Sequence, residues 1–334
     1  MISTEDYQTA RQRVAVIDRA ERRCIVLSGA DRASYLQGLL TNDVVALKPG
    51  EGCYAAYLTP QGRMIADLFV YELGDVMLLT VPREQHRAVL EKLDQFIFSE
   101  DVQLGDVSET FSTTAIVGPE AAGVVSGLTA LQEADLAALA EHGNRRAAFE
   151  GHAVIVTRVT DTGEPGYDLH VEAPAAAALR QALAAAGVPV LDPATADALR
   201  IEAGVPKFGR DMDAETIPLE AGIESRAISF SKGCYVGQEV IIRVLHRGHG
   251  RVARKLVGLT MEGEIVPEPA TRATADGRDI GEVTSSAMSP ALKRPIALAY
   301  LHRDFLAPGT AVTVDGQPAV VTQLPFVSRS QAGN

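Results

Sequence analysis

The chain has 334 residues, enough for two or three domains with sizeable cores. A hydrophobic content of 46% and a charged content of 22% are typical of a soluble globular protein. A formal net charge of -12 argues against general nucleic-acid binding, which depends on basic patches that neutralise phosphate. The three scattered cysteines, Cys24, Cys53 and Cys234, indicate a reducing compartment rather than a disulfide scaffold.

The N-terminal residues are acidic and lack the apolar segment of a secretory signal, and no uninterrupted apolar run reaches membrane length. We therefore expect a cytoplasmic protein without a membrane partner.

The first hundred residues predict strands joined by tight turns. Residues 23–28 are apolar and β-rich, and Asp31 is placed to cap a short helix that carries Tyr35, Leu36, Leu39 and Leu40 on one side. Further strands are expected at 54–59, 64–73 and 76–81. Apolar spacing predicts an amphipathic helix over 84–98.

The middle of the chain mixes strands and helices without a regular βαβ rhythm. Strands are expected at 113–118, 153–159 and 167–171, the last two as a pair, and helices within 119–140 and over 175–186. Asp192 and Pro193 open a helix that continues to Ala203 and ends at Gly204. No Gly-x-Gly-x-x-Gly follows a strand. The expected fold class is α+β with antiparallel sheets.

Beyond Arg251 the pattern changes to short strands at 257–261, 281–285, 296–301 and 311–314, separated by Gly, Pro and Asp-Gly turns. This pattern predicts a small β-barrel. We expect residues 1–250 to form two intertwined α+β subdomains and residues 251–334 to form the barrel domain, with a frayed tail from Val327.

The stretch Lys232-Gly233-Cys234-Tyr235-Val236-Gly237-Gln238-Glu239 places a thiol between two glycines and close to a lysine. A nearby positive charge favours the thiolate, and glycine permits sharp turns and close approach to a ligand. The following residues, 240–244, are β-branched and predict a strand; as a helix, their N-terminal dipole would also lower the pKa of the thiol. The alternative is a buried cysteine in an ordinary turn.

With its flanks, this octapeptide resembles the signature of the YgfZ family of folate-binding proteins, relatives of the glycine-cleavage T-protein (aminomethyltransferase) that support iron–sulfur enzymes. The flanking segments are Arg200-Ile201-Glu202-Ala203-Gly204, Gly209-Arg210-Asp211-Met212-Asp213, Ile217-Pro218-Leu219-Glu220 and Arg247-Gly248. The resemblance covers nearly the whole chain. It implies T-protein-like folate-binding domains, tetrahydrofolate or a derivative as cofactor, and iron–sulfur assembly proteins or client enzymes as partners. T-proteins carry Asp where Cys234 stands.

The resemblance also implies site residues. Cys234 is the expected catalytic or essential residue, and its neighbours in the motif are candidates for folate binding. Those neighbours are Lys232, Gly233, Tyr235, Gly237, Gln238 and Glu239. Arg243 belongs to a local basic stretch that faces either the folate glutamyl carboxylates, an acidic partner or only solvent. The other members of the stretch are Lys232, His246, Arg247, His249, Arg251, Arg254 and Lys255.

Two carboxylates complete the expected site. Glu164 stands in a Thr-Gly-Glu context like that of the family's pterin-binding glutamate, where a carboxylate accepts from the paired N–H donors of a pterin edge. Its alternative is a solvated hairpin tip. Asp67 stands where T-proteins carry an acidic pair, here Ala66-Asp67, so only one of the two positions is acidic. Its alternative is an ordinary strand-end carboxylate.

The remaining candidates are weaker. Cys24 and Cys53 lie in apolar runs and are expected in the core. Three distant cysteines do not supply the four protein ligands that an iron–sulfur cluster usually takes, and the histidines lack zinc-ligand spacing, so no metal site is expected. Tryptophan is absent, which leaves aromatic stacking to Tyr or Phe.

Two functions remain open at this stage. The first is a folate-binding accessory protein for iron–sulfur cluster assembly or repair, with Cys234 essential. The second is a folate-dependent aminomethyl- or methyltransferase. Cys234 in place of Asp and Ala66 beside Asp67 favour the first, and whether the protein is an enzyme stays open.

Overall fold

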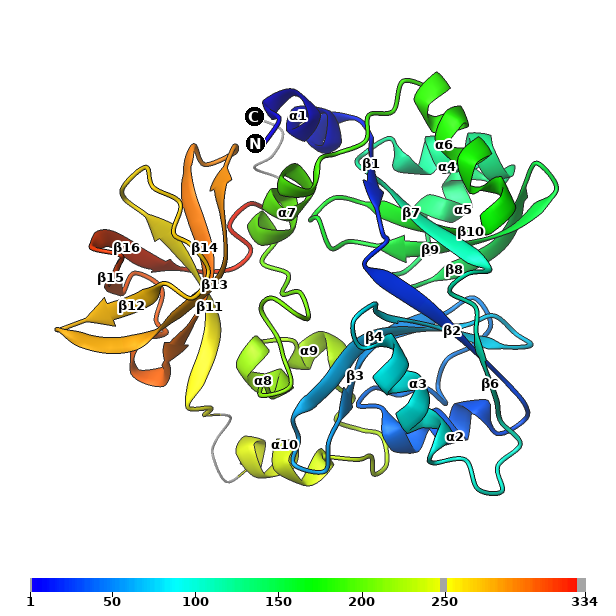
Figure 1. Ribbon diagram of the computed structural model, residues 1–334, viewed down its shortest axis with the longest axis horizontal. Helices are drawn as coiled ribbons and strands as arrows, with labels where there is room; N and C mark the ends of the chain where they lie inside the picture. The colour runs from blue at the N-terminus through cyan, green and yellow to red at the C-terminus, as the bar shows by residue number, and fades with distance from the viewer. Residues whose placement is uncertain (1, 247–250, 329–334) are drawn as a thin grey trace.

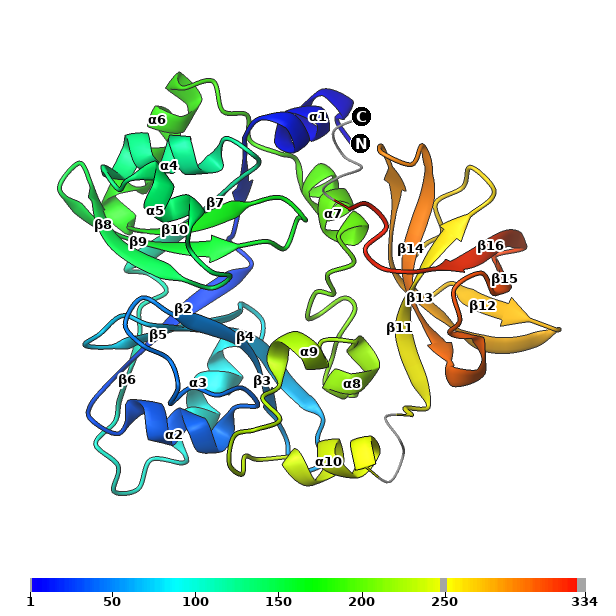
Figure 2. The same cartoon turned by 180° about the vertical axis from the view of Figure 1, so that it is seen from behind.

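The computed structural model describes residues 2–246 and 251–328. Two five-stranded sheets lie on one side of the molecule and a closed barrel on the other, as both views show (Figures 1 and 2). Three helices lie between them: α7 (Pro193–Glu202), α8 (Pro218–Ala221) and α9 (Glu224–Ala227). The expected α+β class with antiparallel sheets and a C-terminal barrel is confirmed.

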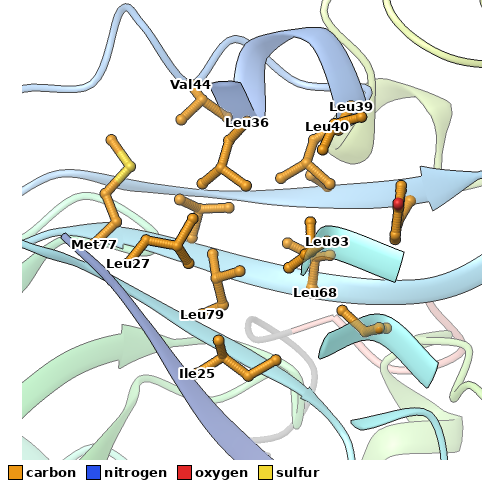
Figure 3. Packing of buried hydrophobic residues seen from close by; sticks show 14 of the residues in the cluster. Ile25, Leu27, Leu36, Leu39, Leu40, Val44, Leu68, Met77, Leu79 and Leu93 are labelled. Carbon is orange, nitrogen blue, oxygen red and sulfur yellow. The ribbon is translucent and has the colours of Figure 1, made fainter. Parts of the chain in front are cut away.

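The first sheet has the strand order β3-β4-β5-β2-β6, and all its pairs are antiparallel. Its strands are β2 (Arg22–Ser28), β3 (Gly52–Leu58), β4 (Met64–Glu72), β5 (Met77–Pro82) and β6 (Gln103–Asp106). Helices α2 (Arg32–Leu39) and α3 (His86–Asp94) pack their apolar sides on it. Figure 3 shows the resulting core, in which Leu36 and Leu93 face strand residues such as Leu27 and Leu79.

The second sheet has the order β1-β7-β10-β9-β8 and is also antiparallel. Its strands are β1 (Ala15–Asp18), β7 (Phe111–Val117), β8 (Asn144–Phe149), β9 (His152–Val159) and β10 (Gly166–Glu172). Its core includes residues of α4 (Ala121–Thr129), α5 (Glu133–Ala137), the 3₁₀ turn Ala173–Ala175 and α6 (Ala176–Ala185). The chain enters this sheet at β1, crosses to β2 through residues 19–21, builds the first sheet and then returns.

The barrel closes in the order β11-β14-β13-β12-β15-β16. Its strands are β11 (Arg254–Met261), β12 (Arg272–Ala275), β13 (Arg278–Ser289), β14 (Arg294–His302), β15 (Ala311–Val314) and β16 (Gln317–Thr322), with a 3₁₀ turn at Arg303–Phe305. Closure pairs every strand edge. A helix that the sequence did not indicate, α1 (Thr4–Gln12), contacts α7 beside the barrel.

Local end signals predicted α7 well. Asp192 caps the helix by accepting hydrogen bonds from the backbone N–H groups of Ala194 and Thr195, and Gly204 takes the left-handed conformation at its end. Asp31, in contrast, makes no cap to α2; its carboxylate accepts from the Asp101 N–H at 2.9 Å. The helix expected over 84–98 is the shorter α3.

The strand expected at 240–244 is wrong, because these residues lie in helix α10 (Gln238–His246). Ile241 is fully buried, with Val244 and Leu245 packed beside it, and this helical spacing outweighs β-branched propensity. The frayed tail is also wrong at Val327, which is buried and donates its N–H to the Glu202 carbonyl. Arg247 and His249 of the expected basic stretch, and Gly248 of the flanking segment, lie outside the described residues.

In the part of the chain that the structure describes, no helix is both long and apolar enough to span a membrane. Across residues 2–246 and 251–328, no group of three or more His, Cys, Asp or Glu residues is arranged to hold a metal ion.

Candidate functional site

A cavity of about 620 Å³ lies where the two sheets meet the segments that lead into and out of α7. Residues 17–22 form one wall, at the crossing from β1 to β2. Residues 205–210, between α7 and α8, form another. The side chains that carry chemistry are Arg19, Arg22, Tyr54, Asp67, Phe69, His142, Asp161, Asp168, Arg200, Lys207 and Arg226.

Asp67 is the acidic group that β4 contributes to this cavity. Its Oδ2 accepts a hydrogen bond from the Tyr54 hydroxyl at 2.9 Å, and its Oδ1 lies 3.5 Å from Nη1 of Arg22. Burial and the Asp67 charge hold the pKa of Tyr54 well above its usual value, so the phenol stays a donor. Ala66 packs instead in the core of the first sheet. Strand alternation thus brings the one acidic residue of the Ala66-Asp67 pair to the cavity.

Two further carboxylates, Asp161 and Asp168, pair with Arg19 at the crossing from β1 to β2. Arg19 Nη1 lies 2.7 Å from Asp161 Oδ2, and Arg19 Nε donates to Asp168 Oδ1 at 3.1 Å. Burial raises the pKa of Asp168. Burial also acts on Asp161, but the Arg19 charge holds the pKa of that carboxyl below its usual value. One cation thus holds two carboxylates, and Oδ2 of Asp168 accepts no hydrogen bond from a described residue.

Aromatic rings form the surface beside Asp67. The Tyr54 and Phe69 ring centroids are 5.1 Å apart, and His142 lies 5.1 Å from Phe69. The guanidinium of Arg22 lies over Phe69 at 4.7 Å and that of Arg226 over Tyr54 at 5.5 Å. The cavity therefore combines flat apolar surface with carboxylates and cations, as small-molecule sites commonly do.

Comparison with known proteins decides the family. Residues 1–232 match the GCVT N-terminal domain, and residues 254–328 match the glycine cleavage T-protein C-terminal barrel domain. The aminomethyltransferase of Streptomyces coelicolor is 33% identical over 98% of this chain and 90% of its own length. That of Nostoc sp. is 30% identical over 99% of this chain and 89% of its own. The chain belongs to the glycine-cleavage T-protein family.

The crystal structure of glycine cleavage system aminomethyltransferase T from Bartonella henselae has the same fold, with a TM-score of 0.86 over 98% of this chain and 90% of that one, at 23% identity. The family matches confirm the relation to the T-protein that the sequence indicated. The narrower assignment to the YgfZ branch stays a prediction.

Glu164 does not line the cavity of this T-protein relative. Its Oε1 pairs with Arg11 Nη1 at 2.9 Å, and the side chain is 2% exposed. Arg11 also pairs with Glu202, whose carboxylate accepts hydrogen bonds from Tyr7 and Ser289. This buried network joins α1, the β9–β10 turn, α7 and the barrel. The cavity carboxylates of the same segment are Asp161, three residues before Glu164, and Asp168, four residues after it. No local signal in the segment separates them from Glu164.

Lys232 holds the C-terminal end of α2 in place. Its ammonium donates to the carbonyls of Gln37, Leu40 and Asn42 at 2.6–2.8 Å, and burial lowers its pKa to about 8. Its charge also lies 5.2 Å from the buried Tyr235 ring. These contacts give Lys232 a structural role that requires no ligand. Its ammonium hydrogen-bonds to backbone carbonyls rather than to the thiol of Cys234.

Gly237 allows α10 to pack against the β3–β4 turn. Its φ is +84°, and a Cβ there would lie 2.6 Å from the Thr59 carbonyl oxygen. Gly62, in that turn, also has positive φ, and a Cβ there would lie 2.8 Å from Cβ of Val240. The two glycines thus place α10 against the first sheet.

The remaining motif residues lie near the surface. Cys234 and Gly233 are exposed, Gln238 is half-buried, and Glu239 pairs with Arg243 across one turn of α10. The cavity that holds Asp67 is lined neither by the octapeptide residues nor by Arg243. Further along the basic stretch, Arg254 and Lys255 pair with Glu220 of α8 and Glu224 of α9. The structure thus brings together Asp67 with residues that the sequence did not single out, and leaves Cys234 apart.

Proposed function

We propose that this chain is a tetrahydrofolate-dependent transferase of a one-carbon group, of the aminomethyltransferase type. The observation that carries the proposal is the cavity of about 620 Å³ with Asp67 held in its wall by Tyr54 and Arg22. The family relation supports tetrahydrofolate as the cofactor, and the relatives named aminomethyltransferase match along nearly their whole length.

The cavity residues fit a folate. Asp67, Asp161 and Asp168 are carboxylates suited to the N–H donors of a reduced pterin. Tyr54, Phe69 and Phe208 supply flat apolar surface for its rings. Lys207, Arg210 and Arg226 are more exposed cations suited to the glutamyl carboxylates. The cavity volume lies within the range of about 300–1,000 Å³ common for small-molecule sites.

Tetrahydrofolate supplies the nitrogen that accepts the one-carbon unit. Asp67 would hold a proton or stabilise positive charge on the bound one-carbon group, and Tyr54 and Arg22 fix both of its carboxylate oxygens. Tyr54 and Asp67 are themselves buried, which limits the access of water to a one-carbon group bound beside them.

The test has two measurements. Calorimetry is expected to show that tetrahydrofolate binds. Mixing with an aminomethyl-lipoyl carrier protein is expected to release ammonia in a folate-dependent single turnover. Asp67→Asn keeps an acceptor for Tyr54 but loses the charge, and is expected to slow turnover by about 10²–10⁴-fold. Absence of folate binding contradicts the proposal; binding without ammonia release contradicts aminomethyl transfer and favours the second candidate below.

The second candidate is the accessory role in iron–sulfur cluster assembly or repair. The observation that favours it is Cys234, an exposed thiol in a motif in which Lys232 and Gly237 have structural contacts. A thiolate is a good iron ligand and nucleophile. In a strain that lacks the gene, wild-type protein is expected to restore iron–sulfur enzyme activity and Cys234→Ser to fail. Full complementation by Cys234→Ser would remove this candidate.

A further inference from the structure

The cavity wall at residues 205–210 is held from behind by one carboxylate, that of Asp211, which is 1% exposed. Its Oδ2 accepts from the backbone N–H of Lys207 at 3.0 Å and from Nη1 of Arg200 at 2.7 Å. The same Nη1 donates to the Val205 carbonyl at 2.8 Å. The Asp211 N–H donates in return to the Lys207 carbonyl at 2.8 Å. Both backbone polar groups of Lys207 are therefore bonded to Asp211.

The barrel supplies the remaining partners of Asp211. Its Oδ1 accepts from the Thr284 hydroxyl at 2.5 Å, and its backbone carbonyl accepts from the Tyr300 hydroxyl at 2.8 Å. Ser285, the next residue of β13, accepts from Nη2 of Arg200 at 2.9 Å. Hydrogen bonds to a carboxylate are stronger than those between neutral groups, so the barrel and the cavity wall are joined firmly at this point.

A β-bulge gives the barrel these two adjacent contacts. In β13 the register shifts between Val283 and Ser285, which makes Thr284 the extra residue. Regular alternation would direct Thr284 and Ser285 to opposite faces of the strand, but here both hydroxyls bond the pair formed by Arg200 and Asp211. Bulges often redirect side chains in this way beside functional sites.

The wall held by Asp211 supplies Lys207, Phe208 and Arg210 to the cavity. Nζ of Lys207 lies 4.0 Å from Oε1 of Glu21, on the wall formed by residues 17–22. A long side chain binds a ligand well only when its backbone is fixed, so a shift of this segment would move all three contacts together. None of the described barrel residues lines the cavity itself.

We infer that Asp211 is a positioning residue of the folate site, through which the barrel fixes the wall at residues 205–210 and sets the affinity for the ligand. The inference rests on the proposed function and adds to it a role for the barrel in ligand binding.

Three substitutions in the barrel test the contact from Thr284. Thr284→Val removes the hydroxyl but keeps the shape, and is expected to weaken tetrahydrofolate binding about tenfold. Thr284→Ser restores the hydroxyl and is expected to bind within about twofold of wild type. Thr260→Val is the matched control, because the hydroxyls of Thr260 and Thr322 bond each other within the barrel at 2.7 Å. It is expected to lower the melting temperature without changing the affinity, which calorimetry measures.

Hydrogen exchange of the ligand-free protein reports on the wall itself. The amides of Lys207 and Asp211 are expected to exchange about tenfold faster in Thr284→Val than in wild type, and at the wild-type rate in Thr260→Val. Tyr300→Phe, which removes the other barrel contact, replaces Thr284→Val if that variant does not fold.

The outcomes separate this inference from the proposed function. If wild type binds tetrahydrofolate and Thr284→Val binds it equally well, the inference fails and the proposed function stands. The same holds if Thr260→Val loses as much affinity, or if the two amides exchange at the wild-type rate in Thr284→Val. If wild type binds no tetrahydrofolate, the proposed function and the inference both fail.

Discussion

The ion pair between Arg11 and Glu164 joins side chains 153 residues apart in the sequence, and both are almost completely buried. Loss of this pair is destabilising, because no solvent replaces the hydrogen bond that the buried guanidinium loses, although Glu202 still compensates its charge. The pair between Arg11 and Glu164 therefore holds α1 against the β9–β10 turn, which leads to Asp168 on the cavity wall.

Glu164→Gln is accordingly expected to lower the free energy of unfolding by about 1.5–3 kcal/mol, the range for a lost hydrogen bond to a charged group, because Arg11 keeps its buried pair with Glu202. The matched control is Glu120→Gln, which breaks the exposed pair with Arg13 and is expected to cost less than about 1 kcal/mol. Urea denaturation measures both. Unchanged stability together with weakened tetrahydrofolate binding would instead return Glu164 to the role of a pterin ligand.

The three thiols differ in their access to solvent. Burial raises the pKa of Cys24 to about 11 and that of Cys53 to about 12, whereas Cys234 is exposed. Because the thiolate is the reactive form, one thiol is expected to react with a maleimide or disulfide reagent in the native protein and two more only after unfolding. Peptide mass mapping identifies the labelled residue. Rapid native labelling of Cys24 or Cys53, or none of Cys234, would contradict the assignment.

At the scale of elements, the octapeptide contains two glycines in different situations. A Cβ at Gly237 would lie 2.6 Å from the Thr59 carbonyl oxygen and φ is +84°, whereas a Cβ at Gly233 meets no atom within 4 Å. Gly237→Ala therefore combines an unfavourable left-handed backbone with a steric clash against the β3–β4 turn.

Gly237→Ala is expected to destabilise the protein by about 2–4 kcal/mol, while Gly233→Ala serves as the control and stays within about 1 kcal/mol of wild type. Denaturant midpoints at constant slope measure the difference. Equal effects of the two substitutions would show that α10 does not depend on this close approach.

Elements whose signals are local could be predicted from the sequence. Asp192, Pro193 and Gly204 mark both ends of α7, and Asp-Gly turns mark the barrel strands. Helix α10 could not be predicted in this way, because its residues favour strand until Ile241 is buried against neighbouring elements.

The cavity could be predicted only in part, because some of its side chains meet only through contacts between distant parts of the chain. Asp67 was found through the resemblance of its strand to T-proteins. Asp168 was not, since its partner Arg19 lies 149 residues away and reaches it only because β1 and β10 both pair with β7. Contacts of that kind follow from the assembled sheet and have no counterpart in a local motif.

At the scale of the whole molecule, buried histidines make stability depend on pH. Burial lowers the pKa of both His142 and His170 to about 4. His170 lies between two hydroxyls, with Thr113 Oγ1 at 2.9 Å from Nδ1 and Thr157 Oγ1 at 3.3 Å from Nε2. In the unfolded chain a histidine titrates near pH 6.5, roughly 2.5 pH units higher.

Between about pH 6.5 and pH 4 the unfolded chain binds a proton at His170 that the folded chain does not bind, so stability falls as the pH falls through this interval. His170→Gln keeps an amide that can bond the two hydroxyls and does not titrate. Between pH 7 and pH 4.5, the wild type is expected to lose about 2 kcal/mol more stability than this variant. Urea denaturation at a series of pH values gives both curves, and taking the difference cancels the contribution of the carboxylates that titrate in the same interval.

Parallel curves would mean that His170 is protonated, or accessible to solvent, in the folded protein. A wild type that lost less stability than the variant would reverse the sign of the shift and show that the buried site favours the charged imidazole.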